Sequence, residues 1–178
     1  MREVLGATAP GSGSLSFDGV VSRMAVELAA SLGTVPRWAF VGIRDGGVPL
    51  ADALASEVGR LTGTKPERGA VDITLYRDDL YSGLEKPVLG ETDLEFEVDG
   101  CGIVLVDDVL FTGRTVRAAL GEVCDYGRPA CVRLAVLVDR GHRELPIAAD
   151  YVGIRVEAEK RDRVTVDWAA RRVIVHPR

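Results

Sequence analysis

Residues 102–117 read Gly102-Ile-Val-Leu-Val-Asp-Asp-Val-Leu-Phe-Thr-Gly-Arg-Thr-Val-Arg117. A short apolar run ends on two carboxylates, Asp107 and Asp108, and a helical pattern follows over about 115–126, where Gly127 ends it. Apolar strands that are separated by helices and buried on both faces indicate parallel pairing through right-handed crossovers. This stretch therefore predicts an α/β fold with an open, mainly parallel, doubly wound sheet.

The same pattern occurs on both sides of this stretch. Near-continuous apolar runs at 38–43 and 131–138 are typical of buried strands, and a further strand is predicted over 71–76. Apolar residues at helical spacing predict helices over about 20–32 and 50–61. Short alternating patterns at 151–156, 164–168 and 172–176 predict a β ribbon that covers an edge of the core.

Length and charge restrict the class of protein. A chain of 178 residues can bury a hydrophobic core without disulfides or a structural metal. The three cysteines (Cys101, Cys124, Cys131) form no CxxC pair, so neither zinc nor disulfides are expected. No 18 apolar residues run together, which predicts no membrane association. With 22 Lys and Arg against 27 Asp and Glu, the net charge of −5 disfavours an extended nucleic-acid surface. We expect a soluble, cytoplasmic protein with a flexible leader (1–16) and a single domain (17–178).

The residues after the acidic pair suit a phosphate group. Gly113 lets the backbone turn so that successive N–H groups converge, and the hydroxyls of Thr112 and Thr115 add donors. The start of a helix supplies positive potential. Carboxylates would repel a phosphate unless they accept hydrogen bonds from sugar hydroxyls or approach a bound metal ion. A phosphorylated sugar with free hydroxyls satisfies both halves of the segment.

Three other interpretations of this segment are possible. A P-loop is disfavoured because no Lys follows Gly113. A phosphoaspartyl transferase would use Asp107 as its nucleophile, with Thr112 nearby. The third interpretation is structural: an acidic strand end next to an ordinary helix cap.

Residues 104–115 resemble the phosphoribosyl pyrophosphate (PRPP) motif of type I phosphoribosyltransferases. Residues 72–80, 134–147 and 149–153 are similar to the PyrR family, whose members are pyrimidine operon attenuators and uracil phosphoribosyltransferases. The similarity runs in matching order and spacing from about Phe17 to about Gly153. It implies a type I phosphoribosyltransferase fold, with a flexible loop and a small hood beside the open sheet.

The resemblance implies a role for each residue of the motif. Asp107 and Asp108 would hold the ribose hydroxyls as catalytic residues, and they would meet Mg²⁺ only indirectly, through PRPP. The implied site for the ribose and the 5-phosphate comprises Asp107, Asp108, Val109, Leu110, Phe111, Thr112, Gly113, Arg114 and Thr115.

The turn after the first core strand matches the pyrophosphate loop of the family. It consists of Arg44, Asp45, Gly46 and Gly47, and its glycines would let backbone amides approach the leaving group. Arg77, in the polar segment 76–90, would neutralise pyrophosphate as that flexible loop closes. From the residues alone, the turn could also be a plain strand-to-helix connection and Arg77 a surface charge. Asp45 and Gly46 depart from the family pattern, which has Thr and Arg there.

The region after the last core strand would border the nucleobase. It includes Val138, Asp139, Arg140, His142 and Arg143, of which His142 is alternatively a local structural hydrogen-bonding residue. The implied reaction displaces pyrophosphate from C1 of PRPP by a nitrogen of uracil and yields UMP, with Mg²⁺ as the cofactor. Catalysis would come from positioning and charge stabilisation, and needs no side-chain nucleophile. A homo-oligomer is also implied.

The second function of the family, binding of pyr leader RNA, is predicted to be weak or absent. Three positions where the family commonly has a basic residue hold Val26, Ala148 and Ile154. RNA affinity depends on phosphate neutralisation, and Arg23 and Arg44 are the remaining candidates on that face. An alternative is a diverged phosphoribosyltransferase or nucleotide-binding regulator that uses another base or has lost catalysis.

Overall fold

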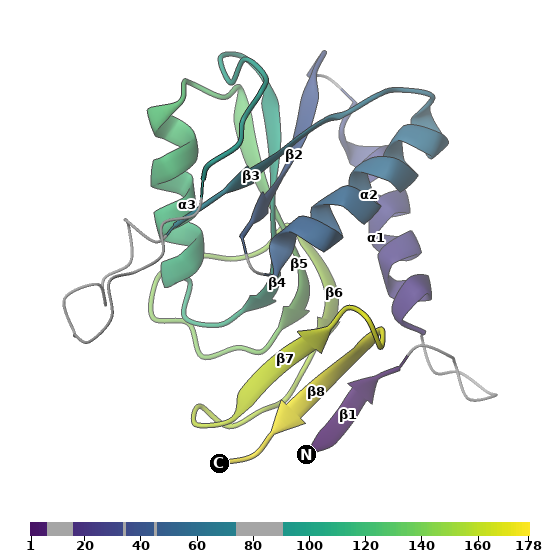
Figure 1. The fold of residues 1–178 in the computed structure, drawn as a ribbon, viewed down its shortest axis with the longest axis vertical. Helices are drawn as coiled ribbons and strands as arrows, with labels where there is room; N and C mark the ends of the chain where they lie inside the picture. The colour runs from purple at the N-terminus through teal and green to yellow at the C-terminus, as the bar shows by residue number, and fades with distance from the viewer. Residues whose placement is uncertain (7–15, 34, 45, 74–90) are drawn as a thin grey trace.

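The computed structural model describes residues 1–6, 16–33, 35–44, 46–73 and 91–178. Its main layer is a five-stranded sheet in the order β3-β2-β4-β5-β6 (Figure 1). The strands are β2 (Trp38–Ile43), β3 (Glu67–Val71), β4 (Gly102–Leu110), β5 (Cys131–Asp139) and β6 (Tyr151–Arg155). Neighbouring strands pair in parallel throughout. The predicted α/β class with an open parallel sheet is confirmed.

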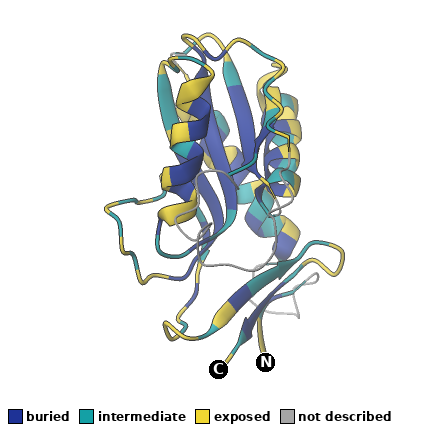
Figure 2. Ribbon diagram, turned by 60° about the vertical axis from the view of Figure 1, so that its left-hand side comes forward, coloured by how far each residue is buried: buried dark blue, intermediate teal, exposed yellow. Residues whose placement is uncertain are grey.

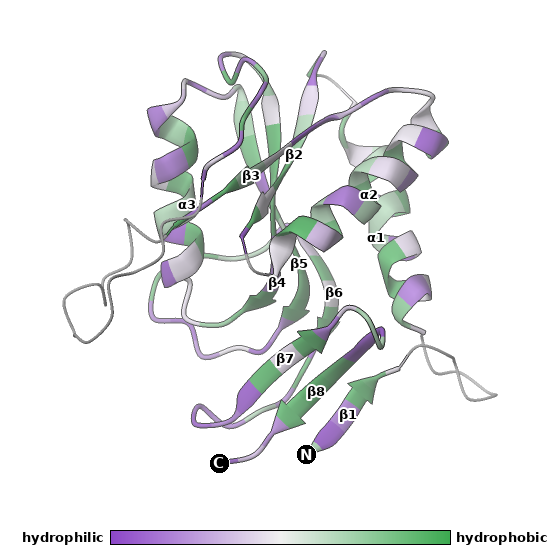
Figure 3. Ribbon diagram, in the orientation of Figure 1, coloured by the Kyte–Doolittle hydropathy of each residue, from purple (hydrophilic) through white to green (hydrophobic). Residues whose placement is uncertain are grey.

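Helices cover both faces of this sheet. Helices α1 (Phe17–Ser31) and α2 (Gly47–Thr62) lie on one face, and α3 (Arg114–Asp125) lies on the other (Figure 1). Phe40 and Val104 pack in the core under α1 and α2, whereas their chain neighbours Val41 and Ile103 pack under α3. Successive side chains of a strand point to opposite faces, so both faces are buried (Figure 2) and the central strands are mostly hydrophobic (Figure 3).

A second, antiparallel sheet lies beside the ends at which β4 and β5 finish (Figure 1). Its order is β1-β8-β7, with β1 (Arg2–Leu5), β7 (Arg163–Asp167) and β8 (Arg172–His176). This sheet, together with the connection 156–162 that leads into it, is called the hood below. The predicted C-terminal ribbon is confirmed as β7 and β8, whereas β6 joins the main sheet instead.

Two boundary predictions need correction. The leader predicted over 1–16 is wrong for residues 2–5, because they pair with an edge of β8 and bury Leu5 in the core; residues 7–15 lie outside the described part. The strand predicted over 71–76 is instead β3, which ends at Val71, and residues 74–76 are not described. Over the described residues, no helix has the length and apolarity that crossing a membrane requires.

Candidate active site

The acidic pair lies in the last part of the central strand β4. The register pairs Gly42 with Val106, so β2 ends at Ile43 while β4 continues to Leu110. The sequence predicted that the strand ends at the carboxylates, but pairing with β5 extends it to Leu110, two residues past Asp108. In open α/β sheets, ligands bind outside the carboxyl ends of the strands. Asp107 and Asp108 therefore lie at the edge where this fold places its ligands.

The two carboxylates have different surroundings. Asp107 is 6% exposed, and its Oδ1 accepts a hydrogen bond of 3.0 Å from the backbone N–H of Asp108. Burial, followed by the neighbouring charge of Asp108, raises the pKa of Asp107 well above its ordinary value. Asp108 is only half-buried. The pair thus combines a carboxyl that resists ionisation with a more exposed one that can face a ligand.

The turn between β2 and α2 lies directly against this pair. An ideal Cβ on Gly47 would overlap the carbonyl oxygen of Val106, and one on Gly46 would overlap the carboxyl group of Asp108. Gly46 is also the N-cap of α2, so the first turn of that helix begins beside Asp108. The glycines allow the chain to come this close. The turn is more than a plain connection, because it forms one wall of the acidic site.

Of the remaining residues predicted to bind pyrophosphate, the structure describes Arg44 but not Asp45 or Arg77. Arg44 is exposed, and its Nε donates a hydrogen bond of 2.7 Å to the carbonyl oxygen of Glu91. Asp45, and Arg77 with the predicted flexible loop (76–90), lie outside the described residues.

The phosphate loop, residues 112–115, lies at the start of α3. Gly113 caps this helix with a φ of +91°, a left-handed conformation in which a side chain would be strained. Arg114 donates from its backbone N–H to Thr112 Oγ1 at 3.4 Å. The predicted combination of a glycine turn, hydroxyl groups and a helix N-terminus is present in the structure.

A second segment supports the phosphate loop from outside. The backbone N–H groups of Glu144 and Leu145 both donate to the carbonyl oxygen of Thr112, at 2.9 and 3.1 Å. The Nε of Arg114 donates to Glu144 Oε2 at 3.1 Å, and Lys160 Nζ lies 3.0 Å from Glu144 Oε1. Sequence reasoning gave Glu144 no role, because a lone surface glutamate does not reveal a partner 30 residues away.

In the region predicted to border the nucleobase, the side chains form hydrogen bonds and ion pairs mainly with other protein groups. Asp139 pairs with Arg143 at 2.6 Å and accepts from the Gly141 N–H at 2.9 Å. Partial burial alone would raise the pKa of Asp139, but these hydrogen bonds outweigh it and hold the pKa below its ordinary value. His142 Nε2 lies 2.7 Å from the carbonyl oxygen of Ala158, in agreement with the structural alternative considered for this histidine.

Two arginines of this region bond to other parts of the protein: Arg143 to the residue that follows β4, and Arg140 to the hood. Arg143 donates to the carbonyl oxygen of Phe111 at 2.7 Å, and Arg140 contacts the hood. Val138 is fully buried in the core.

Arg23, one of the two candidates for RNA contact, is engaged within the protein. Its guanidinium pairs with Glu27 at 2.7 Å and donates to the carbonyl oxygens of Val152 and Gly153 on the edge strand β6. These bonds tie α1 to the sheet. An arginine used in this way contributes less to a cationic surface than its formal charge suggests.

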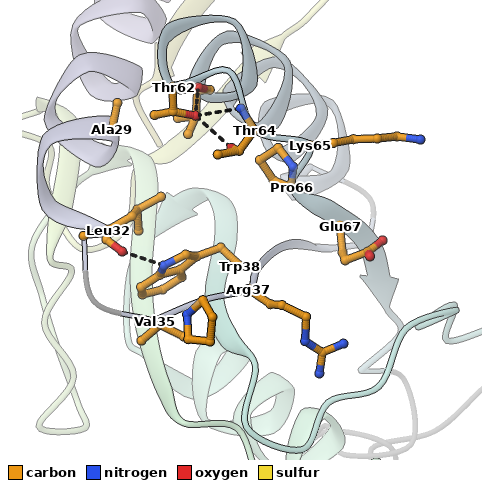
Figure 4. Close-up of a pocket in the computed structure, with 13 residues that line it drawn as sticks. Ala29, Leu32, Val35, Arg37, Trp38, Thr62, Thr64, Lys65, Pro66 and Glu67 are labelled. Atoms are coloured by element: carbon orange, nitrogen blue, oxygen red, sulfur yellow. Dashed lines mark hydrogen bonds between the residues drawn. The ribbon is translucent and has the colours of Figure 1, made fainter.

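A cavity of about 410 Å³ lies at the opposite end of the sheet (Figure 4). It is lined by the first residues of β2 and β3, Trp38 and Glu67, and by residues at the ends of α1 and α2. The indole N–H of Trp38 donates to the carbonyl oxygen of Leu32 at 2.7 Å. None of the predicted site residues lines this cavity. The acidic pair is at the carboxyl ends of the strands, so the predicted site is separate from this cavity.

The fold and the acidic strand end define a class of protein. The sequence model of the phosphoribosyl transferase domain family matches residues 19–169, which include the acidic pair and the phosphate loop. The hypoxanthine phosphoribosyltransferase of Trypanosoma cruzi has the same fold, with a TM-score of 0.68 at 17% identity, covering 91% of this chain and 93% of that chain. The Staphylococcus aureus enzyme of that name gives a TM-score of 0.66 at 16% identity, covering 88% and 85%.

More similar relatives narrow the class. The chain is 47% identical over 162 residues to the bifunctional protein PyrR of Deinococcus radiodurans, covering 89% of this chain and 88% of the relative. It is 51% identical over 144 residues to that of Chloroflexus aurantiacus, covering 81% and 79%. The chain therefore belongs to the PyrR family of phosphoribosyltransferases. The resemblance that residues 72–80, 104–115, 134–147 and 149–153 suggested is confirmed.

Proposed function

We propose that this protein is a uracil phosphoribosyltransferase, which forms UMP and pyrophosphate from uracil and PRPP. One observation carries the proposal. The acidic pair of β4 is bordered on one side by a glycine turn that begins a helix, and it leads on the other into a phosphate loop that begins a second helix. This arrangement offers two sites for anions around acceptors for hydroxyl groups, which matches the two phosphorylated ends and the ribose of PRPP.

Each part of the site has a role in binding. Asp107 and Asp108 would accept hydrogen bonds from the two ribose hydroxyls, and the N–H groups and hydroxyls of residues 112–115 would bind the 5-phosphate. The backbone of Gly46 and Gly47 and the start of α2 would bind pyrophosphate. Arg44 and, in the predicted flexible loop, Arg77 would add positive charge to that subsite.

The reaction depends on positioning. Uracil N1 releases its proton to water, the N1–C1 bond forms, and the bond from C1 to the pyrophosphate oxygen breaks, with the electron pair leaving on pyrophosphate. C1 becomes positively charged in the transition state, so a carboxylate near the ribose and donors around the leaving group stabilise it. Holding both reactants in this geometry supplies most of the remaining catalysis.

The donor set suits a magnesium ion carried by the substrate. Within the described residues, no group of three or more His, Cys, Asp or Glu side chains could hold a metal ion. Mg²⁺ prefers oxygen ligands and is commonly bound by one or two carboxylates together with substrate phosphates, so Asp107 and Asp108 fit it through PRPP. When bound, Mg²⁺ would neutralise charge on the departing pyrophosphate.

A direct assay tests the proposal. Purified protein with labelled uracil, PRPP and Mg²⁺ should form UMP, and Asp108→Asn should lower kcat/KM for PRPP by about 100-fold, the scale of one lost charge-stabilising contact. Asp52→Asn, at an exposed aspartate on α2 that pairs with Arg68 at 3.5 Å, is the matched control and should keep activity. Absence of UMP under conditions in which a known uracil phosphoribosyltransferase works would overturn the proposal.

For RNA, we infer that any binding of pyr leader RNA by this chain is weak at physiological salt. The relatives are named bifunctional. In this chain, Arg23 is bonded to Glu27 and to β6, and Arg44 to Glu91. A filter-binding titration with the leader RNA of its own operon, with and without UMP and at several salt concentrations, should give micromolar or weaker dissociation constants. Nanomolar affinity at about 150 mM salt would contradict this inference.

A further inference from the structure

Arg140 is a buried arginine between the main sheet and the hood. It follows the last residue of β5, is 5% exposed, and its backbone N–H donates to the carbonyl oxygen of Leu110 at 3.1 Å. A buried guanidinium is costly unless its donors are used. Burial also lowers the pKa of Arg140 from its ordinary value.

A turn of the hood accepts hydrogen bonds from the terminal nitrogens of Arg140. Its two terminal nitrogens donate to the carbonyl oxygens of Asp162, at 2.5 Å, and of Glu159, at 2.6 Å. That turn is closed by its own bonds, from the Asp162 N–H to the Glu159 carbonyl oxygen at 3.0 Å and from the Glu159 N–H to Asp162 Oδ2 at 2.9 Å. The hood thus presents a preformed group of carbonyl oxygens to a cation of the core.

The same guanidinium also contacts the strand end that bears the acidic pair. Its carbon atom lies 4.0 Å from the centre of the Phe111 ring, within the range of a cation–π contact. Phe111 follows the last residue of β4 and directly precedes the phosphate loop. Arg140 therefore joins two segments that are distant in sequence, the turn 159–162 and the start of the phosphate loop.

Other links join the hood to the segment that follows Arg140. His142 bonds to Ala158, and Lys160 pairs with Glu144, but His142 is exposed and Lys160 has a side chain 66% exposed. Exposed ion pairs stabilise little, because water and salt screen them. Arg140 is the buried member of this set, and its hydrogen bonds are charge-assisted.

We infer that Arg140 is a positioning residue, which fixes the hood against the phosphate loop and acts on the substrate site through Phe111. It does not act as a base-binding side chain, because its two terminal nitrogens are committed to hood carbonyls and its Nε is buried, with no hydrogen-bond partner among the described residues. Lysine cannot replace it, since one ammonium group lacks the planar fork that spans two carbonyls and covers a ring. This inference rests on the proposed function only for its kinetic readout.

Kinetics provide the first test. Arg140→Met and Arg140→Lys should both lower kcat/KM for PRPP by between about 10-fold and 100-fold, the effect of a small misplacement of reacting groups. Phe111→Leu should lower it similarly, and the double variant Arg140→Met/Phe111→Leu should be no worse than the more damaging single variant. Arg133→Met, at an exposed arginine of β5 paired with Asp150, is the control and should stay within twofold of wild type. Rescue by lysine, or full additivity in the double variant, would overturn the inference.

Hydrogen exchange provides a readout that does not need activity. In Arg140→Met, backbone amides of residues 156–167 should exchange at least tenfold faster, while those of β2 and β4 keep their wild-type rates. Unchanged exchange in the hood would overturn the inference even if activity fell. If the wild-type protein makes no UMP, the proposed function fails, whereas the exchange experiment still decides whether Arg140 holds the hood. Loss of protection in β2 and β4 as well would show a general structural role and would also count against it.

Discussion

Asp108 occupies the space in which a side chain at position 46 would have to lie. Gly46 departs from the PyrR pattern, which has an arginine at this position. The structure adds a steric reason for the glycine: with this turn and this carboxylate in place, a side chain at position 46 has no room. The loop and the acidic pair are therefore parts of one packed unit.

Gly46→Ala should impair PRPP binding without unfolding the protein. The new Cβ would meet the far end of the Asp108 side chain, which can rotate away, so the carboxylate moves and the backbone stays. We expect KM for PRPP to rise about tenfold, equivalent to one lost hydrogen bond to a charged group, and the melting temperature to stay near that of wild type. Gly33→Ala is the control, because a Cβ there has open space around it. A wild-type KM would show that Asp108 does not need this space.

Gly47→Ala, unlike Gly46→Ala, should lower the stability of the folded protein. Here the new Cβ would meet the carbonyl oxygen of Val106, and this backbone lies in the central strand and cannot move aside. Overpacking of this kind costs about 1–3 kcal/mol. Urea denaturation should show a lower midpoint, and the melting temperature should fall by about 2–4 °C for each kcal/mol. If Gly47→Ala were as stable as Gly46→Ala, the two contacts would not differ as described.

Asp107→Asn should stabilise the protein at neutral pH while it weakens PRPP use. Burial and the charge of Asp108 raise the pKa of Asp107 in the folded state, so the ionised carboxylate is unfavourable there, whereas Asn keeps the Oδ1 acceptor for the Asp108 N–H. Below the pKa of the unfolded state, about 3.9, Asp is protonated in both states and the variant has no advantage. Wild type loses stability relative to the variant as the pH rises through the folded-state pKa.

Melting temperatures of wild type and Asp107→Asn across pH 4 to 8 check this sign. The difference should be small near pH 4 and grow in favour of Asn towards neutral pH. A difference that shrinks as the pH rises would mean that the Asp107 carboxylate is paired in the folded state. Asp52→Asn, at an exposed aspartate, should show no such trend.

The positions of the predicted site residues in the fold follow from the sequence better than their contacts with other segments. The placement of Asp107, Asp108 and Gly113 could be predicted because it depends on local features: a strand end, a helix start and a position with positive φ. The hood contacts of Arg140 were not predicted, because carbonyl oxygens carry no residue signature and the turn lies 19 to 22 residues away. Strand β1 was missed for a related reason, since four residues are too few for a recognisable period and the strand is specified by its pairing with β8.

Glu144→Gln should strengthen binding of a phosphorylated ligand. In the structure Glu144 holds the Nε of Arg114 at 3.1 Å, and the pKa of Glu144 is lowered by its hydrogen bonds with Lys160 and Arg114, so it is ionised at neutral pH. A 5-phosphate bound at residues 112–115 would compete with this carboxylate for Arg114 and would be repelled by its charge. The pair is exposed, with side chains 51% and 34% accessible, so the effect should be modest: about twofold to fivefold tighter UMP binding by calorimetry. Because salt screens an exposed charge, the gain should shrink at 0.5 M NaCl.

Glu57→Gln, which removes a similar exposed carboxylate paired with Arg60 on α2, should leave UMP affinity unchanged. Weaker binding by Glu144→Gln would instead mean that the glutamate orients Arg114 for the phosphate.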